Sequence, residues 1–235
     1  MNLNMEVIEE IEKRGISHIV HFTQSRNFKS ILNDGELRSV ASLADDKFKS
    51  YSESDSIRAD GHPDKLSVSI QYPNAYYLNK ARPRAEGFED WIMLVLEPQV
   101  LAFEGTLFCP YNAAKSGVPR QPGGEGLKAC YAQSIDSGGP RAFCRGVQHD
   151  PRCPTDLQAE ALVPAPIPIE YIKGVVVPSD EDALQEQGRL RLLHADPDQL
   201  RWYVAPGMFD VGTVRLAAQN GRRITGKEYI RGGLA

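Results

Sequence analysis

The stretch Leu157-Gln158-Ala159-Glu160-Ala161-Leu162-Val163 alternates between apolar and polar side chains over most of its length, which is typical of a β-strand. Gln158 and Glu160 would lie on one face of this strand, and the alanines and the valine would pack into the core from the other face. A carboxylate held on a rigid strand beside an amide could act on a bound substrate. A solvent-facing edge strand produces the same pattern, so the spacing leaves both interpretations open.

Other segments predict further strands. Leu66-Ser-Val-Ser-Ile-Gln-Tyr72 alternates and ends at the turn residues Pro73-Asn74. Trp91-Ile-Met-Leu-Val-Leu96 is apolar throughout, which suits a buried central strand. His18-Ile-Val-His21-Phe22 and Ile172-Lys-Gly-Val-Val-Val177 are shorter strand signals on either side of these two in the chain. Together they predict one β-sheet.

Helices and long loops complete the pattern. Apolar residues at helical spacing precede both Gly15 and Gly35, and Ser179 with Asp182 forms a capping box for a helix that Gly188 could end. Residues 40–64 and 109–155 lack periodicity, and loops of this length are usually functional. The chain therefore predicts a mixed α+β fold, with the single domain spanning residues 1–235 and only weak structure signals after Gly212.

Composition and charge describe an ordinary globular protein. The 235 residues are 41% hydrophobic and 25% charged, with 31 acidic and 27 basic side chains and a net charge of −4. This balance excludes a nucleic-acid binder that relies on bulk positive charge, but it leaves room for a local basic site. No run approaches the roughly 18 apolar residues of a membrane span. The acidic start of the chain is unlike a secretory leader, so we expect a cytoplasmic protein with no membrane partner.

The cysteines do not form a metal-binding motif. Cys144, His149 and Cys153 are suitable zinc ligands by type, and Cys109 and Cys130 lie upstream. Zinc ligands usually come in pairs two to four residues apart, and the chain has no Cys-x-x-Cys. We therefore expect ordinary reduced thiols and no bound metal. The glycine-rich phosphate-binding motifs of nucleotide-binding proteins are also absent.

Basic side chains gather in three places. Residues 215–235 hold five basic side chains and one acidic one, although the protein as a whole is acidic. Smaller groups occupy residues 80–84, around a proline, and residues 141–152, in a stretch rich in glycine, proline and cysteine. Each group could simply be a solvated face. A role in contacting phosphates requires that the groups converge in the folded protein.

Several pieces of the chain, taken in order, resemble one family. They are His18-Ile-Val-His21-Phe22-Thr23 with Asn27, Ile31-Leu32-x-x-Gly35, Arg58-Ala-Asp60-Gly61, Ser67-Val-Ser69-Ile70-x-x-Pro73-Asn74-x-Tyr76-Tyr77, Thr155-Asp156 with the Glu160 strand, and Ile169-Glu170-Tyr171-Ile172. Their order and spacing, from about residue 18 to about residue 178, resemble the DarT family of toxin ADP-ribosyltransferases, which modify bases in single-stranded DNA. The Arg-x-Asp-Gly and Ser-Ile-x-x-Pro-Asn variants look closer to the guanine-modifying branch than to the thymidine-modifying one.

The resemblance implies a split, bent β-sheet core flanked by helices, with NAD as co-substrate. It makes Glu160 the catalytic carboxylate and Arg58 its essential partner. The residues implied in NAD binding are His21, Phe22, Thr23, Asn27, Leu32, Gly35, Arg58, Tyr76 and Tyr77. Those implied in DNA binding are Gln158, Arg141, Arg145 and Arg152, with residues 109–155 as the substrate-recognition segment and residues 213–235 as a basic C-terminal stretch.

The implied chemistry suits these residue types. Breaking the nicotinamide–ribose bond develops positive charge on the ribose, which a carboxylate stabilises without a metal. An arginine suits the pyrophosphate, because its planar fork donates bidentate hydrogen bonds. Single-stranded DNA is a plausible partner because its bases are accessible.

The family also implies a toxin that acts as a monomer and is opposed by an ADP-ribosylhydrolase-type antitoxin. Two other functions remain open on the sequence. The first is an ADP-ribosyltransferase or phosphotransferase that acts on RNA or protein. The second is a non-enzymatic nucleic-acid-binding module in which Glu160 is a surface residue.

Overall fold

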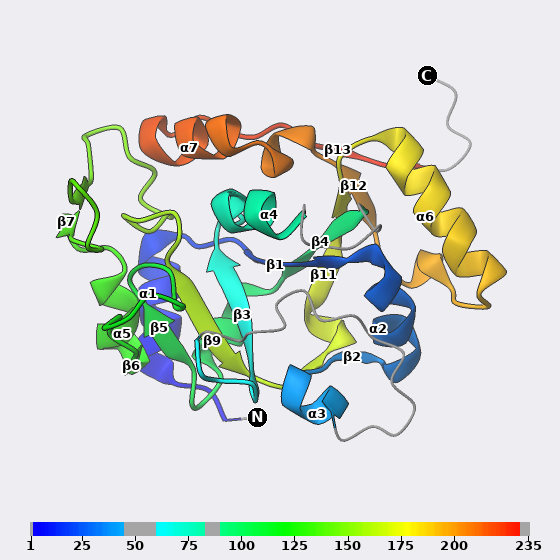
Figure 1. The fold of residues 1–235 in the computed structure, drawn as a ribbon, viewed down its shortest axis with the longest axis horizontal. Coiled ribbons are helices and arrows are strands. Elements are labelled where there is room, and N and C mark those ends of the chain that lie inside the picture. The colour runs from blue at the N-terminus through cyan, green and yellow to red at the C-terminus, as the bar shows by residue number, and fades with distance from the viewer. Residues whose placement is uncertain (1, 45–59, 83–89, 231–235) are drawn as a thin grey trace.

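A mixed β-sheet forms the centre of the molecule. The structure, a computed structural model, describes residues 2–44, 60–82 and 90–230, so Arg58 and Arg84 lie outside the described residues. Within them the sheet has nine strands (Figure 1). Their order across the sheet is β13 (Lys227–Glu228), β12 (Trp202–Val204), β11 (Ile172–Val177), β4 (Trp91–Leu96), β1 (Ile19–Gln24), β3 (Lys65–Ile70), β9 (Glu160–Pro164), β5 (Leu107–Cys109) and β6 (Gln121–Pro122).

The sheet splits between β1 and β3. Strand β1 pairs with β4 along its whole length, from Ile19 opposite Leu96 to Gln24 opposite Trp91. Its pairing with β3 is limited to Ile19 opposite Ile70 and Val20 opposite Ser69. On its other edge β3 pairs with β9 from Lys65 opposite Pro164 to Ser69 opposite Glu160. The predicted split sheet is therefore confirmed. The split leaves a gap between β1 and β3.

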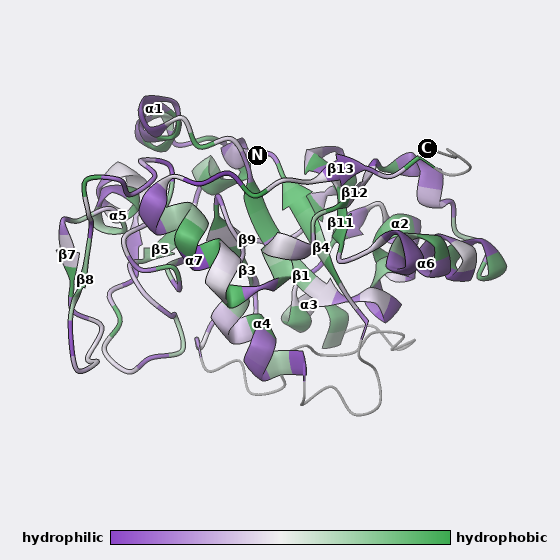
Figure 2. Ribbon diagram, turned by 90° about the horizontal axis from the view of Figure 1, so that it is seen from above, coloured by the Kyte–Doolittle hydropathy of each residue, from purple (hydrophilic) through white to green (hydrophobic). Residues whose placement is uncertain are grey.

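Helices cover both faces of the sheet. Strand residues Ile19, Val68 and Leu94 pack with α1 (Met5–Arg14), α2 (Phe28–Asp34), α5 (Gly123–Ala129) and α6 (Asp180–Leu192). On the other face, Val20 and Met93 pack with α4 (Ala75–Ala81), and α7 (Val211–Asn220) packs on α4 in turn. Figure 2 shows α1 and α4 on opposite sides of the sheet. Both faces are therefore buried, which explains the continuous apolar runs in the central strands.

Short elements frame one end of the split. They are β2 (Glu36–Leu37), which pairs with β10 (Ile167–Pro168), and helix α3 (Val40–Ala44). A separate two-stranded ribbon, β7 (Ser134–Ile135) with β8 (Phe143–Cys144), projects from the 109–155 segment. No helix in the described part of the chain has the length and apolar character that a membrane crossing requires.

Two sequence-based expectations were wrong in their bounds. The strand predicted over residues 157–163 begins only at Glu160, because Asp156 forms a turn: its carboxylate accepts the Gln158 amide at 2.9 Å. The helix that Ser179 caps as expected, through the Asp182 amide at 3.1 Å, does not end at Gly188. It continues because Leu190 is fully buried in the core, and this packing offsets the low helix propensity of glycine.

Helix α7 was not predicted, since its apolar face is narrow. Its start is nevertheless encoded locally, because the Asp210 carboxylate accepts the Thr213 amide at 2.7 Å. Gly221 follows with a φ of 62°, a left-handed conformation that ends the helix. The weak signals after Gly212 therefore correspond to an ordered helix up to Asn220.

His18, just before β1, is expected to make stability depend on pH. Burial, with Lys173 and Arg152 nearby, lowers the pKa of His18 to about 4. The unfolded chain takes up this proton below about pH 6.5 and the folded chain does not. Stability should therefore fall between pH 6.5 and 4, by roughly 1–2 kcal/mol at pH 5. Urea unfolding at pH 7 and pH 5 measures this. The difference between the two pH values should shrink in His18→Gln, and an equal difference in both proteins would contradict the assignment.

Candidate active site

A cavity of about 170 Å³ opens where β1 and β3 separate. Its wall is built from β1, β3, the first residue of β9, helix α2, β2, α3 and the first turn of α4. The polar or aromatic residues of this wall are His21, Phe22, Thr23, Asn27, Ser30, Asp34, Glu36, Arg38, Asp60, Ser67, Ser69, Asn74, Tyr77, Asn112 and Glu160. The cavity thus brings together segments from the first and the second half of the chain.

Two side chains hold the carboxylate of Glu160. The Ser67 hydroxyl donates to Glu160 Oε2 at 2.9 Å, and the Asn74 amide nitrogen donates to Glu160 Oε1 at 3.1 Å. Ser67 lies on the neighbouring strand, and Asn74 directly precedes α4. Both oxygens are therefore oriented, and hydrogen bonds of this kind favour the ionised carboxylate.

Asn74 is itself fixed from three sides. It is only 2% exposed, and its backbone amide donates to Ser69 Oγ at 3.0 Å. Its side-chain oxygen accepts the Tyr77 amide at 3.0 Å and so caps α4. Because the oxygen is used by the cap, the nitrogen must be the atom that faces Glu160. From the sequence, Asn74 was identified as a turn residue and as part of a family motif but was given no role in the site, although an asparagine three residues before Tyr77 also fits a helix cap.

The opposite wall comes from β1. His21 Nδ1 lies 2.9 Å from the Ser67 carbonyl oxygen, which can only accept, so Nδ1 carries a proton. This hydrogen bond spans the split in the sheet. Asn27 donates to the Thr23 hydroxyl at 3.1 Å, which holds both side chains against the cavity. Four residues are thereby placed around the cavity: His21 and Thr23 of β1, Ser67 of β3, and Asn27, which directly precedes α2.

Aromatic rings close another part of the wall. The Phe22 ring lies 6.0 Å from that of Tyr77 and 5.9 Å from that of Trp91, measured between centroids. Phe22 and Tyr77 both line the cavity. They provide an apolar surface against which a flat ring could pack.

Three residues predicted for NAD binding, Leu32, Gly35 and Tyr76, do not line the cavity, and neither does Gln158, which was predicted for DNA binding. Leu32 is 5% exposed and belongs to the core, where it anchors α2. Gly35 ends α2 with a φ of 70°, a conformation that glycine adopts readily. Tyr76 is partly buried and does not line the cavity. Gln158 lies in the turn before β9 rather than on the strand, and it does not line the cavity either.

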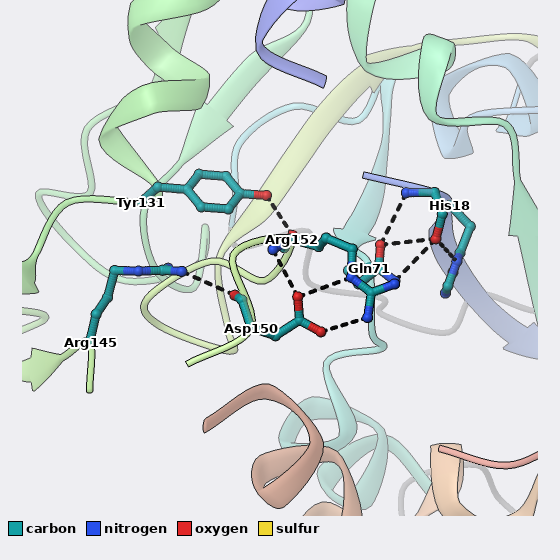
Figure 3. A network of polar contacts seen from close by, with 7 residues as sticks. His18, Gln71, Tyr131, Arg145, Asp150 and Arg152 are labelled. Carbon is teal, nitrogen blue, oxygen red and sulfur yellow. Dashed lines mark hydrogen bonds and ion pairs between the residues drawn. The ribbon is translucent and has the colours of Figure 1, made fainter. Parts of the chain in front are cut away.

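Arg145 and Arg152, predicted to contact DNA, hold the chain around them in place (Figure 3). Arg145 donates to the backbone carbonyls of Cys153 at 2.8 Å and Asp150 at 3.0 Å. Arg152 donates to both carboxylate oxygens of Asp150, at 3.0 and 2.7 Å. Burial opposes ionisation, yet the hydrogen bonds from Arg152 hold the pKa of Asp150 below its usual value. Arg141, in contrast, is exposed.

Removing the Asp150 carboxylate is expected to loosen this part of the chain. Asp150 is 4% exposed, so Asp150→Ala leaves the Arg152 guanidinium without its buried partner. A loss of about 2 kcal/mol in the free energy of unfolding follows from breaking such a pair. Urea unfolding measures the loss, and limited proteolysis should show new cleavage within residues 130–155. Arg141→Gln is the control and should change neither, whereas equal behaviour of the two variants would contradict the scaffold role.

Arg38 is a cavity residue that sequence reasoning missed. Arg38 lines the cavity, and its guanidinium lies 3.6 Å from the Asp34 carboxylate. It also donates to the Ser42 hydroxyl at 3.1 Å, so α3 orients it. No sequence motif marks it, because its position depends on the turn between β2 and α3.

The cysteines are dispersed. Cys109, Cys130 and Cys153 are buried, and Cys144 is exposed. Burial, with the nearby Glu160 carboxylate, raises the pKa of the Cys109 thiol to about 12. This thiol therefore stays protonated at neutral pH, although it lies opposite Glu160 in the sheet. Among the described residues, no group of three or more potential ligands could hold a metal ion.

The split sheet with an oriented carboxylate in the split defines the fold class as that of an ADP-ribosyltransferase. The model of the family described as "ssDNA thymidine ADP-ribosyltransferase, DarT" matches residues 20–210. The chain belongs to the DarT family. Its residues 211–230, which include α7 and β13, lie outside this match.

Solved structures agree with this fold. Thermus sp. 2.9 DarT in complex with NAD+ has a TM-score of 0.53 and 17% identity, covering 83% of this chain and 98% of that chain. The same protein in complex with ADP-ribosylated ssDNA has a TM-score of 0.55 and 17% identity, with 83% and 97% covered. Thermosipho africanus DarTG in complex with ADP-ribose has a TM-score of 0.57 and 16% identity, with 82% and 51% covered. Among curated proteins no sequence matches the chain.

Proposed function

We propose that this protein transfers ADP-ribose from NAD to a base in single-stranded DNA and releases nicotinamide. The observation that carries the proposal is the Glu160 carboxylate, held by Ser67 and Asn74 in the wall of the cavity of a DarT-family fold. Support also comes from the Thermus relative, whose structures contain NAD+ and ADP-ribosylated ssDNA.

Glu160 would act on the ribose of NAD. As the bond to nicotinamide breaks, positive charge develops on the ribose carbon, and a carboxylate oriented before the reaction stabilises it. The attacking nitrogen of the base then forms the new bond to this carbon. The proton lost by the base can pass to Glu160.

The remaining wall would bind NAD. His21, Thr23 and Asn27 offer polar groups for the ribose and the amide, and Phe22 with Tyr77 offers a face for the nicotinamide ring. Arg38 adds a cation suited to the pyrophosphate. Leu32, Gly35 and Tyr76 would support this site through packing. Arg58, outside the described residues, keeps the partner role that the family resemblance implies.

The 109–155 segment would read the DNA base. It contributes Asn112 to the cavity wall, and the Asn112 side-chain oxygen accepts the Ala114 amide at 2.9 Å. The Asn112 amide nitrogen is then the atom left to donate to an acceptor on a base. The preference for guanine rests on the Arg-x-Asp-Gly and Ser-Ile-x-x-Pro-Asn variants, which resemble the guanine-modifying branch. Gln158 and Arg141 would contact the strand near the turn and the β7–β8 ribbon, with Arg145 and Arg152 shaping the segment. We propose guanine as the preferred base.

The biological setting follows from the family resemblance alone. We propose a monomeric cytoplasmic toxin that an ADP-ribosylhydrolase-type antitoxin counteracts. The acidic net charge of −4 is compatible with this setting, because a short single strand needs local contacts rather than a strongly basic surface.

Labelled NAD tests the function directly. The protein is incubated with NAD labelled in the adenosine moiety and with single-stranded DNA, single-stranded RNA or a protein extract. We expect label on DNA, and only on oligonucleotides that contain guanine. Label on thymine-only DNA would overturn the base preference. Label confined to RNA or protein would overturn the substrate, and nucleic-acid binding without any label would support a non-enzymatic module.

A further inference from the structure

Three exposed arginines form a surface at the C-terminal end of the described chain. Arg215 lies on α7, and Arg222 and Arg223 follow directly after it. We call these three residues the C-terminal basic surface. They lie beyond residues 20–210, where the family match ends. The role of this surface is therefore a property of this chain that the family match does not supply.

These guanidinium groups differ from several other cations on the surface, which pair with a carboxylate. Lys173 pairs with Glu97, Arg191 with Asp198 and Lys227 with Asp180. None of the three guanidinium groups forms a hydrogen bond or an ion pair with the residues that the structure describes. Three like charges within nine residues repel one another, and a polyanion would relieve that repulsion.

The C-terminal basic surface adjoins the 109–155 segment. The Asp150 amide donates to the Ala218 carbonyl at 2.7 Å, and the Gln148 carbonyl lies close to Gly221, 3.4 Å from where a Cβ would stand. Figure 1 shows this end of α7 beside the segment that leads to β7. Val147, next to Gln148 in the chain, is fully exposed.

The same segment reaches the cavity. Its residues Asn112 and Ala114 line the cavity wall, while residues 147–150 contact the end of α7. Helix α7 also packs on α4, whose capping residue Asn74 holds Glu160. The basic surface thus lies on and directly after the helix that packs against α4, and a helix is about 10 Å in diameter. A strand of several nucleotides spans such a distance.

We propose that the C-terminal basic surface binds the phosphodiester backbone of the single-stranded DNA that flanks the modified base. The arginines contact phosphates, which positions the strand without selecting its sequence. The identity of the strand rests on the proposed function. The binding of a polyphosphate chain rests only on the position of these three charges and on their lack of a partner among residues 2–44, 60–82 and 90–230.

The experiment compares wild type with Arg215→Gln/Arg222→Gln/Arg223→Gln. Fluorescence anisotropy measures the binding of single-stranded oligonucleotides of about 6 and about 24 nucleotides over a salt series, without NAD. We expect the triple variant to bind the longer strand at least about tenfold more weakly, with the salt slope reduced by about 2. Binding of the shorter strand and of NAD should change less than twofold, because the cavity is untouched.

A matched variant separates local contacts from total charge. Lys173→Gln/Arg191→Gln/Arg201→Gln removes the same three charges at other surface positions, and we expect it to bind both strands as wild type does. Equal loss in the two variants, or an unchanged salt slope in the first, would overturn the proposal. So would a loss confined to RNA or duplex DNA. If wild type binds the longer strand through these arginines but modifies no DNA, the proposed function is wrong, whereas the proposal that this surface binds a phosphodiester backbone is retained.

Discussion

Replacing Glu160 with glutamine is expected to reduce ADP-ribose transfer to single-stranded DNA by two or more orders of magnitude. The glutamine keeps the size of the side chain and one oxygen that can accept from Asn74, and the Ser67 hydroxyl can turn to accept from the new amide nitrogen. It removes the negative charge that stabilises the positive charge developing on the ribose. The loss of such a contact reduces reaction rates by two or more orders of magnitude. Initial rates with labelled NAD measure the effect.

The fold should survive this change. Glu160 is only half-buried and faces the cavity, so the melting temperature should stay close to that of wild type. Glu170→Gln, at an exposed position outside the cavity, is the matched control and should retain full activity. A Glu160→Gln protein with a rate within about tenfold of wild type would remove Glu160 from the catalytic role.

Replacing Asn74 with aspartate is expected to reduce transfer about ten- to a hundredfold near neutral pH and to shift the acid limb of the rate profile upward. The new carboxylate can still cap α4, but it faces Glu160 where an amide donor stood 3.1 Å away. Two carboxylates at this distance share a proton, which raises one pKa of the pair. Since transfer needs the ionised form of Glu160, activity should recover as the pH rises.

Asn74→Ala distinguishes positioning from simple support of the fold. It removes both the donor to Glu160 and the cap of α4, at a cost of about 1 kcal/mol in stability. Its rate should fall at every pH, without a shift of the profile. Rates from pH 5 to 9 for wild type and both variants test this. If the aspartate variant keeps the wild-type profile, Asn74 does not act through the charge of Glu160.

The first and last residues of a strand were predictable where the hydrophobic pattern of the sequence matches which side chains are buried. Strands β3 and β4 lie within a residue or two of their predicted positions. The apolar side chains of β4 are buried on both faces, and those of β3 alternate with serines that line the cavity. The segment before Glu160 misled the analysis. The alternation over residues 157–159 arises from a turn around Asp156, whose local hydrogen bond competes with the strand.

The same contrast applies to the residues of the site. His21, Phe22 and Thr23 line the cavity, as does Glu160. The sequence marked the first three as the end of one predicted strand and Glu160 as a polar position within another, and the family resemblance assigned all four to the site. Gln158 and Tyr76 do not line it. The predicted alternation with Glu160 suggested Gln158, and the family resemblance suggested Tyr76, but a turn and the direction of a short helix decide where these side chains lie.

By itself, the sequence determined the α+β class, the central strands and the residue types around Glu160, since periodicity and caps are local properties. Only the tertiary structure decided how these residues act together. Ser67 and Asn74 lie 93 and 86 residues before Glu160, and they reach it because β3 pairs with β1 over only two residues and with β9 along its other edge. That register depends on packing from both faces of the sheet, which no single stretch of the chain encodes.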